Sequence, residues 1–218
     1  MYVKDQMNNK PYCVTKETSI SKALEIMSMH NFHRLPVVDK DNNLVGLITE
    51  GLISEATPGK ATSLSIYEIN YLLNKSNVGD IMIKDVVTID PDALLEEAAV
   101  KMRTNDIGCL VACRDNKVTG IITQNDIFRA FIDLLGYNRK GTRYVINVKE
   151  DKVGILADVA MLFKQLDINI TNLAVYNTSR GIEVVVIATG DKCNEAAKAL
   201  TDSGYNLTDV LTKEEGTN

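Results

Sequence analysis

The feature that most constrains the fold of this chain is an internal repeat with a period of about 75 residues. The segment 27–38 matches the segment 102–113, with Met27 over Met102. Further along, Gly46–Thr49 matches Gly120–Thr123, and there the spacing between the copies has fallen by one residue. The deletion lies near Asp39 in a polar segment expected to be a turn, and turns tolerate deletions that paired strands do not. The chain therefore contains two copies of one structural unit.

Both copies show the same order of expected elements. A short extended piece leads into an amphipathic helix, because apolar residues recur at i, i+3, i+4 and i+7 in each copy. Two strands joined by an Asp/Asn-rich turn follow, and a second helix begins after Thr49 and after Thr123. The predicted strands are Arg34–Val38 and Leu44–Thr49, then Cys109–Cys113 and Lys117–Thr123. Each unit is thus β-α-β-β-α, and the helical period of Ser65–Lys75 predicts a connecting helix between them.

The part of the chain after the second copy has a different pattern. Gly136–Thr142 is a polar, glycine-flanked segment that indicates a linker. After it, helices predicted to begin at Gly154 and at Asp191, a candidate N-cap, alternate with four strands. These strands are Tyr144–Lys149, Ile168–Tyr176, Ile182–Thr189 and Tyr205–Leu211. The order β-α-β-β-α-β is the ferredoxin-like arrangement, so the chain is predicted to be a mixed α/β (α+β) protein.

Composition excludes several classes of protein. The chain has 218 residues, of which 45% are hydrophobic and 24% charged, as in ordinary globular proteins, and no apolar run approaches a membrane span. The N-terminus does not resemble a signal peptide, so a cytoplasmic location is expected. A formal net charge of −5 argues against general nucleic-acid binding. The four cysteines have the spacing of neither a disulfide scaffold nor a zinc site.

The repeated unit resembles the CBS domain, named after cystathionine β-synthase. The resemblance rests on His33-Arg34-Leu35-Pro36-Val37-Val38-Asp39 and on Gly120-Ile121-Ile122-Thr123-Gln124-Asn125-Asp126. Two such domains in tandem resemble a Bateman module. The C-terminal part resembles an ACT domain through Asp151-Lys152-Val153-Gly154 and Asp167-Ile168-Asn169-Ile170. Two CBS domains followed by an ACT domain are similar to the acetoin-utilisation accessory proteins of bacteria.

This resemblance divides the chain into parts and implies what they do. CBS domains are expected at 1–56 and 78–136, a linker with the connecting helix at 57–77, a second linker at 137–142 and the ACT domain at 143–218. CBS pairs commonly bind adenosine-containing ligands between the domains: AMP, ADP, ATP, NAD or S-adenosylmethionine. ACT domains commonly bind an amino acid between two copies or simply dimerise. The chain is therefore expected to be a homodimeric sensor with a regulatory ligand and no cofactor, and a metabolic enzyme is a candidate partner.

Two other functions have to be weighed against the sensor. An enzyme needs a nucleophile–base pair or a metal, but no such constellation is visible. The two histidines, His30 and His33, lack a third metal ligand, so we expect neither a catalytic nor a metal site. A scaffold or accessory subunit that dimerises without a ligand remains the alternative.

The second copy carries the better candidate for a nucleoside site. Thr123 and Asp126 are three residues apart at a strand-to-helix junction, where a carboxylate can accept hydrogen bonds from both hydroxyls of a ribose. The helix N-terminus adds backbone N–H groups for a phosphate. The same spacing is that of a helix cap, and the spacing alone favours the cap. The resemblance implies ribose binding.

The first copy departs from this pattern. It keeps Thr49 but has Leu52 where the aspartate is expected, and leucine cannot accept a hydrogen bond. Basic residues show the opposite asymmetry. His33 and Arg34 lie where related modules contact phosphate, whereas the second copy has Gly108 and Cys109 there. We expect one good nucleoside site at Thr123 and Asp126, walled by Phe32 and His33 and without a basic pair of its own, and one degraded or differently selective site.

In the ACT-like part, Asp151, Gly154 and Asn169 are the candidates for binding an amino acid. Gly154 opens a helix directly after a strand, so backbone N–H groups there face a carboxylate. Asn169 begins the next strand, at the seam expected in a dimer. In the simpler alternative, the glycine serves a tight turn and the asparagine caps the strand.

Overall fold

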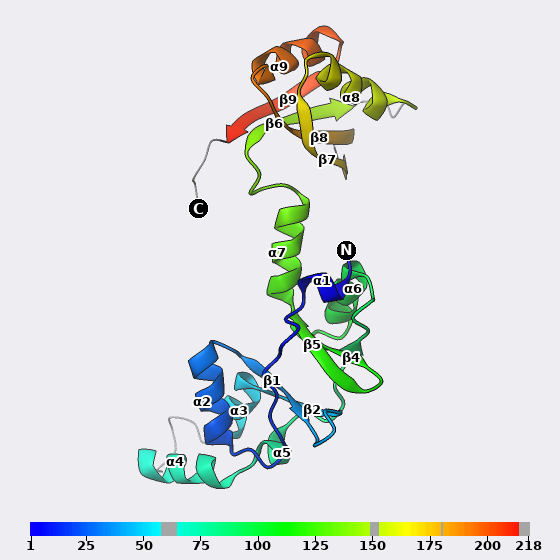
Figure 1. Ribbon diagram of the computed structural model, residues 1–218. Coiled ribbons are helices and arrows are strands. Elements are labelled where there is room, and N and C mark those ends of the chain that lie inside the picture. The colour runs from blue at the N-terminus through cyan, green and yellow to red at the C-terminus, as the bar shows by residue number, and fades with distance from the viewer. Residues whose placement is uncertain (58–64, 149–152, 180, 214–218) are drawn as a thin grey trace. The chain divides into compact units, whose positions relative to one another are not determined.

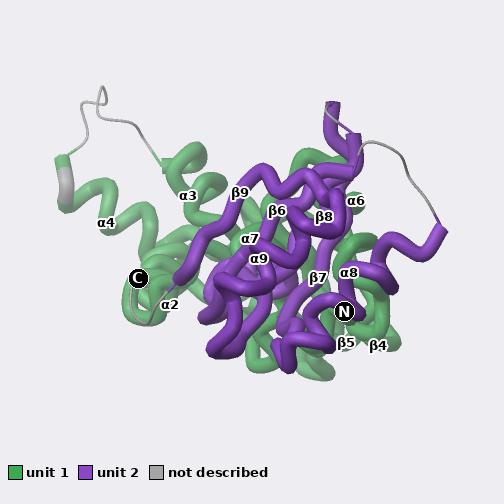
Figure 2. Tube along the Cα trace, turned by 90° about the horizontal axis from the view of Figure 1, so that it is seen from above, with its two compact units in different colours: residues 1–128 green, residues 129–218 purple. Residues whose placement is uncertain are grey.

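A computed structural model describes residues 1–57, 65–148, 153–179 and 181–213, and Figure 1 labels most of their elements. The chain divides into two compact units, Met1–Phe128 and Arg129–Asn218, which Figure 2 colours separately. The first unit contains nearly all of both repeat copies, and helix α7 (Gln124–Leu134) crosses the boundary. The mixed α/β fold predicted from the sequence is confirmed.

In the first copy, helix α2 (Ile20–His30) precedes the antiparallel strands β1 (Arg34–Val38) and β2 (Leu44–Thr49), and helix α3 (Glu50–Ala56) follows. Helix α2 begins where it does because the Ser19 side chain accepts a hydrogen bond from the backbone N–H of Lys22. It ends at Asn31, whose left-handed backbone (φ 54°) stops the helix. Both strands have the predicted bounds. The predicted extended piece at 13–15 forms one parallel bridge, from Val14 to Val37.

The second copy repeats this arrangement. Strand β3 (Thr88–Ile89), helix α6 (Leu95–Thr104), strands β4 (Cys109–Arg114) and β5 (Lys117–Thr123) and helix α7 follow one another. Both antiparallel ladders contain a bulge at the equivalent position, between Val37 and Val38 and between Ala112 and Cys113. The connecting helix α4 (Ile66–Lys75) begins after Ser65, as predicted.

Two short helices extend the repeat and pack crosswise. Helix α1 (Val3–Gln6) lies against the second copy, where the N–H of Val3 donates to the carbonyl of Ala93 at 2.9 Å. Helix α5 (Val78–Ile81) makes the equivalent contact with the first copy, from the N–H of Val78 to the carbonyl of Thr18 at 2.8 Å. The helix that precedes the first copy thus packs on the second copy, and the helix that precedes the second copy packs on the first. No pattern in the sequence indicates this exchange, because each of the two helices has only four residues.

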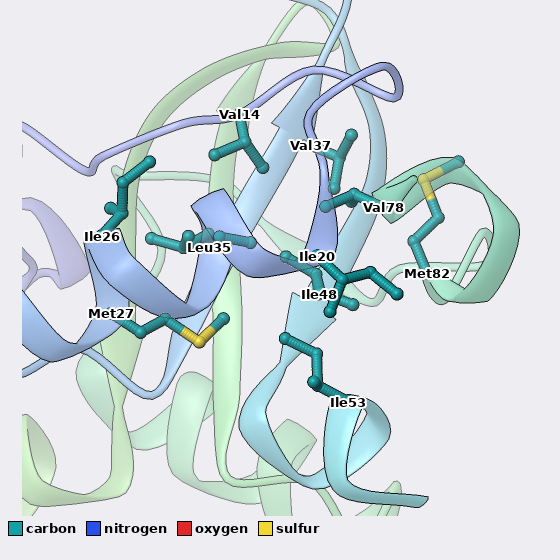
Figure 3. Packing of buried hydrophobic residues seen from close by; sticks show 11 residues of the cluster. Val14, Ile20, Ile26, Met27, Leu35, Val37, Ile48, Ile53, Val78 and Met82 are labelled. Atoms are coloured by element: carbon teal, nitrogen blue, oxygen red, sulfur yellow. The ribbon is translucent and has the colours of Figure 1, made fainter. Parts of the chain in front are cut away.

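The core of the first copy shows the exchange directly (Figure 3). Val78 and Met82, which follow the connecting helix, pack with residues of α2, β1, β2 and α3. The other labelled members are Val14, Ile20, Ile26, Met27, Leu35, Val37, Ile48 and Ile53. Because apolar burial is the main stabilising contribution, α5 is an integral part of this copy.

The second unit is a four-stranded antiparallel sheet in the order β7-β8-β6-β9. Its elements are β6 (Gly141–Val148), α8 (Ile155–Gln165), β7 (Asn169–Thr178), β8 (Gly181–Thr189), α9 (Cys193–Asp202) and β9 (Asn206–Lys213). This is the predicted ferredoxin-like order. Tyr144 and Phe163 meet edge to face in its core, and the Tyr144 hydroxyl donates to the carbonyl of Cys193 at 2.7 Å. Asp191 is not the N-cap of α9, because the helix begins at Cys193 after Lys192.

The predicted linker at 137–142 and the residues just before it form hydrogen bonds with strands of this sheet. Strand β6 already begins at Gly141. The Arg139 guanidinium donates to the carbonyl of Thr171 at 2.7 Å, and the Asn172 amide donates to the carbonyl of Leu134 at 2.6 Å. The predicted domain boundaries remain predictions.

Candidate functional site

The first unit contains two cavities that the repeat relates to each other. The Thr123 cleft has a volume of about 450 Å³ and the Thr49 cleft one of about 430 Å³. The Thr123 cleft is lined by Asn8, Asn31, Phe32, His33, Arg34, Gly108, Ile121, Thr123, Gln124, Asn125 and Asp126. The Thr49 cleft is lined by His33, Arg34, Leu47, Thr49, Glu50, Gly51, Ile83, Asp85, Val86, Val87, Asp106, Ile107, Gly108 and Cys109. Both copies contribute to each cleft.

The structure brings the predicted nucleotide-site residues together in these clefts. Thr123, Asp126 and Phe32 line the Thr123 cleft, and Thr49 and Cys109 line the Thr49 cleft. His33, Arg34 and Gly108 line both. Asn8 also lines the Thr123 cleft, although no motif in the sequence points to it. It reaches the cleft because the N-terminal segment packs on the second copy. Its backbone forms a bridge with Ile121.

The Thr123–Asp126 pair is a helix cap in this structure. Asp126 Oδ2 accepts hydrogen bonds from the Thr123 hydroxyl at 2.7 Å and from the Thr123 backbone N–H at 2.9 Å. These two residues therefore form the cap of α7, which is the alternative that their spacing alone favours. Asp126 is also half-buried and faces the cavity, so a ribose that binds this carboxylate has to share it with the cap.

The equivalent position of the first copy is part of the core. The Thr49 hydroxyl caps α3 by accepting from the N–H of Leu52 at 3.2 Å. Leu52 itself packs against the buried cluster of the first copy and does not line the Thr49 cleft. Glu50 does line it, and its carboxylate lies 2.7 Å from Nδ1 of His33.

Arg34 lies on the boundary between the clefts. Its Nη1 donates to the carbonyl of Gly108 at 3.3 Å, and a Cβ on Gly108 would lie 2.6 Å from Nη2 of Arg34. The glycine thus leaves the space that the guanidinium fills. The second copy gives the Thr123 cleft no basic pair of its own, because Gly108 and Cys109 occupy the equivalent positions. His33 and Arg34 both line this cleft from the first copy.

Of the candidate amino-acid-binding residues, the two that the structure describes, Gly154 and Asn169, do not line one cavity. Gly154 has a positive φ (98°) and lines a cavity of about 410 Å³ in the second unit. Asn169 is exposed and does not line this cavity, because it pairs with Thr189 at the far end of β8. Asp151 lies outside the described residues.

Within residues 1–57, 65–148, 153–179 and 181–213, no three His, Cys, Asp or Glu side chains are grouped so that they could hold a metal ion. Over the same residues, no helix is both long enough and apolar enough to cross a membrane.

Paired clefts between two tandem copies of one α/β unit define a ligand-binding repeat module. The chain belongs to the CBS domain family, whose sequence pattern matches residues 3–58 and 78–133. CBS domains are generally regulatory modules.

Among curated proteins, the chain is 35% identical over 129 residues to a homoserine O-acetyltransferase of Methanohalobium evestigatum. The match covers 59% of this chain but only 24% of that enzyme, so the chain spans about a quarter of its length. A CBS domain-containing protein of Dictyostelium discoideum is 31% identical over 134 residues, which are 61% of this chain and 92% of that protein.

Three solved structures share the fold of the first unit. A candidate acetoin utilization protein (AcuB) from Vibrio cholerae has a TM-score of 0.53 at 25% identity, over 63% of this chain and 95% of that one. The CBS domain pair of protein MJ0100, solved with 5′-methylthioadenosine and S-adenosyl-L-methionine, has a TM-score of 0.50 at 31% identity, over 60% and 99%. CBSX2 in complex with AMP has a TM-score of 0.50 at 26% identity, over 61% and 96%.

Proposed function

We propose that this chain is a non-catalytic regulatory protein of the cytoplasm that binds an adenosine-containing ligand in the Thr123 cleft. Candidate ligands are AMP, ADP, ATP, NAD and S-adenosylmethionine. Similarity to CBS pairs solved with adenosyl ligands supports this proposal. The observation that carries it is the cavity of about 450 Å³ in which an aromatic side chain, a carboxylate and a guanidinium from two copies meet.

Each part of such a ligand has a chemical counterpart in the cleft. Asp126 and Thr123 would hold the ribose, because a carboxylate accepts two charge-assisted hydrogen bonds from vicinal hydroxyls. Phe32 is half-buried and stacks with His30 at 5.5 Å between ring centroids, so it forms a firm apolar wall for adenine. Arg34, His33 and the N-terminus of α7 would face a phosphate.

The test is calorimetric titration of the full chain with AMP and with S-adenosylmethionine. Replacing Asp126 with alanine should weaken binding about ten-fold or more, because hydrogen bonds to a charged group contribute roughly 1.5–3 kcal/mol. Unchanged affinity in Asp126→Ala, or no binding of either compound to the wild type, would refute the proposal.

The change also removes a helix cap, so a matched control is needed. Glu68 accepts from the Ser65 backbone N–H at 2.8 Å and from the Ser65 hydroxyl at 2.7 Å, which closely reproduces the Thr123–Asp126 geometry. It caps α4 and lines neither cleft. Glu68→Ala should therefore cost a similar amount of stability and leave ligand affinity unchanged.

The second candidate function is a dimerising scaffold or accessory subunit of a metabolic enzyme. It is favoured by the exposed apolar side chains of α7, where Phe128 and Phe131 are 61% and 56% exposed. Such a face suits a homodimer, and the ACT-like part would dimerise or bind an amino acid near Gly154. Analytical ultracentrifugation with and without AMP distinguishes the candidates, because only a sensor responds to the ligand.

A further inference from the structure

The two clefts share their cationic groups. Among the described residues that line them, the positively charged or protonatable nitrogen side chains are Arg34 and His33, and both side chains line both cavities. The second copy cannot supply another pair, since Gly108 and the buried Cys109 occupy the equivalent positions.

The carboxylates are distributed unequally between the clefts. The Thr123 cleft has Asp126, whereas the Thr49 cleft has Glu50, Asp85 and Asp106. An anionic ligand group in the Thr49 cleft would face three carboxylates. The cationic groups of this cleft, Arg34 and His33, also line the other cavity. Like charges that line one cavity disfavour binding of an anion, the more so where water is partly excluded.

We propose that the two clefts compete for the guanidinium of Arg34, so that one chain binds a single phosphate-bearing nucleoside, in the Thr123 cleft. A phosphate in that cleft holds Arg34 on its side of Gly108 and leaves the Thr49 cleft acidic. The Thr49 cleft then accepts only an uncharged or cationic ligand. This inference rests on the proposed function and adds the charge and the stoichiometry of the ligands.

The competition is reciprocal because it is a coupling free energy between two sites. A second phosphate-bearing ligand would have to bind without Arg34 or take Arg34 from the first. Either course loses charge-assisted hydrogen bonds, which corresponds to about ten-fold or more in affinity. An uncharged nucleoside has no phosphate for the Arg34 guanidinium to bind, so it does not compete for this side chain.

The test is calorimetric titration with AMP and, separately, with adenosine, on the wild type and on Arg34→Met. For the wild type we expect one AMP per chain, bound about ten-fold or more tightly than adenosine. In Arg34→Met the preference for AMP over adenosine should fall to about two-fold or less. Arg103 on α6 lines neither cleft, so Arg103→Met is the matched control and should behave as the wild type.

Two AMP molecules bound with equal affinity per chain, or an undiminished preference for AMP in Arg34→Met, would overturn this inference and leave the proposed function intact. Absence of binding of either compound to the wild type would overturn both.

Discussion

Substitutions at Gly46 and Gly120 test whether the short helices α5 and α1 each pack on the opposite repeat copy. A Cβ on Gly46 would lie 2.9 Å from the carbonyl oxygen of Ile83, and a Cβ on Gly120 would lie 2.9 Å from that of Asn8. Met82 and Met7 also approach these two positions closely. The methionine side chains can move aside, but the carbonyls belong to backbone bridges and cannot do so without breaking hydrogen bonds.

The cost of Gly46→Ala follows from these contacts. Leu47 and Ile83 exchange two backbone hydrogen bonds of 2.9 Å, and each contributes about 1 kcal/mol. Overpacking of a filled site costs roughly 1–3 kcal/mol. We therefore expect Gly46→Ala to lower the free energy of unfolding by about 2–3 kcal/mol and the midpoint of thermal unfolding by roughly 5–15 °C.

Circular dichroism during thermal and urea unfolding measures this change. Gly51 is the matched control, because a Cβ there meets only the Thr49 hydroxyl, at 3.8 Å. Gly51→Ala lies in α3, where alanine is the better helix former, so it should leave stability unchanged or raise it slightly. Equal stability of Gly46→Ala and the wild type would refute the exchange of α5 into the first copy.

Two further predictions concern titratable groups. Hydrogen bonds from the Asn43 side chain and backbone lower the pKa of Asp39. The stabilisation is therefore present above the unfolded pKa of about 3.9 and is lost as the pH falls through the folded value, so the unfolding temperatures of wild type and Asp39→Asn should converge at low pH. A constant difference from pH 3 to pH 6 would contradict this. Burial raises the pKa of Cys113 to about 11, so little of this thiol is the reactive thiolate at pH 8. Peptide mapping after reaction with Ellman's reagent at pH 8 should therefore show far slower labelling of Cys113 in the folded chain than in urea. Equal labelling rates in the two states would contradict the raised pKa.

The elements of each copy were predictable because their signals are local. The strand bounds of Arg34–Val38 and Leu44–Thr49 follow from alternation and from the Asp/Asn turn between them. The connecting helix α4 was predicted from its apolar period and from Ser65. The exchange of α1 and α5 was not, because each has only four helical residues and its partner is distant in sequence.

The candidate sites were predictable in composition but not in geometry. The repeat brought Thr123, Asp126 and Phe32 to one cleft, as expected. The direction of a long side chain such as Arg34 depends on which space is open across the repeat, and that space is left by Gly108. Gly154 and Asn169 were predicted together, but the antiparallel order of the sheet separates them within one chain.

The most direct test of the proposed nucleoside site is a crystal structure of the chain grown with AMP. We expect AMP in the Thr123 cleft, with its ribose hydroxyls on the Asp126 carboxylate and its phosphate within reach of Arg34. AMP in the Thr49 cleft alone, or a Thr123 cleft that stays empty at saturating AMP, would contradict this expectation.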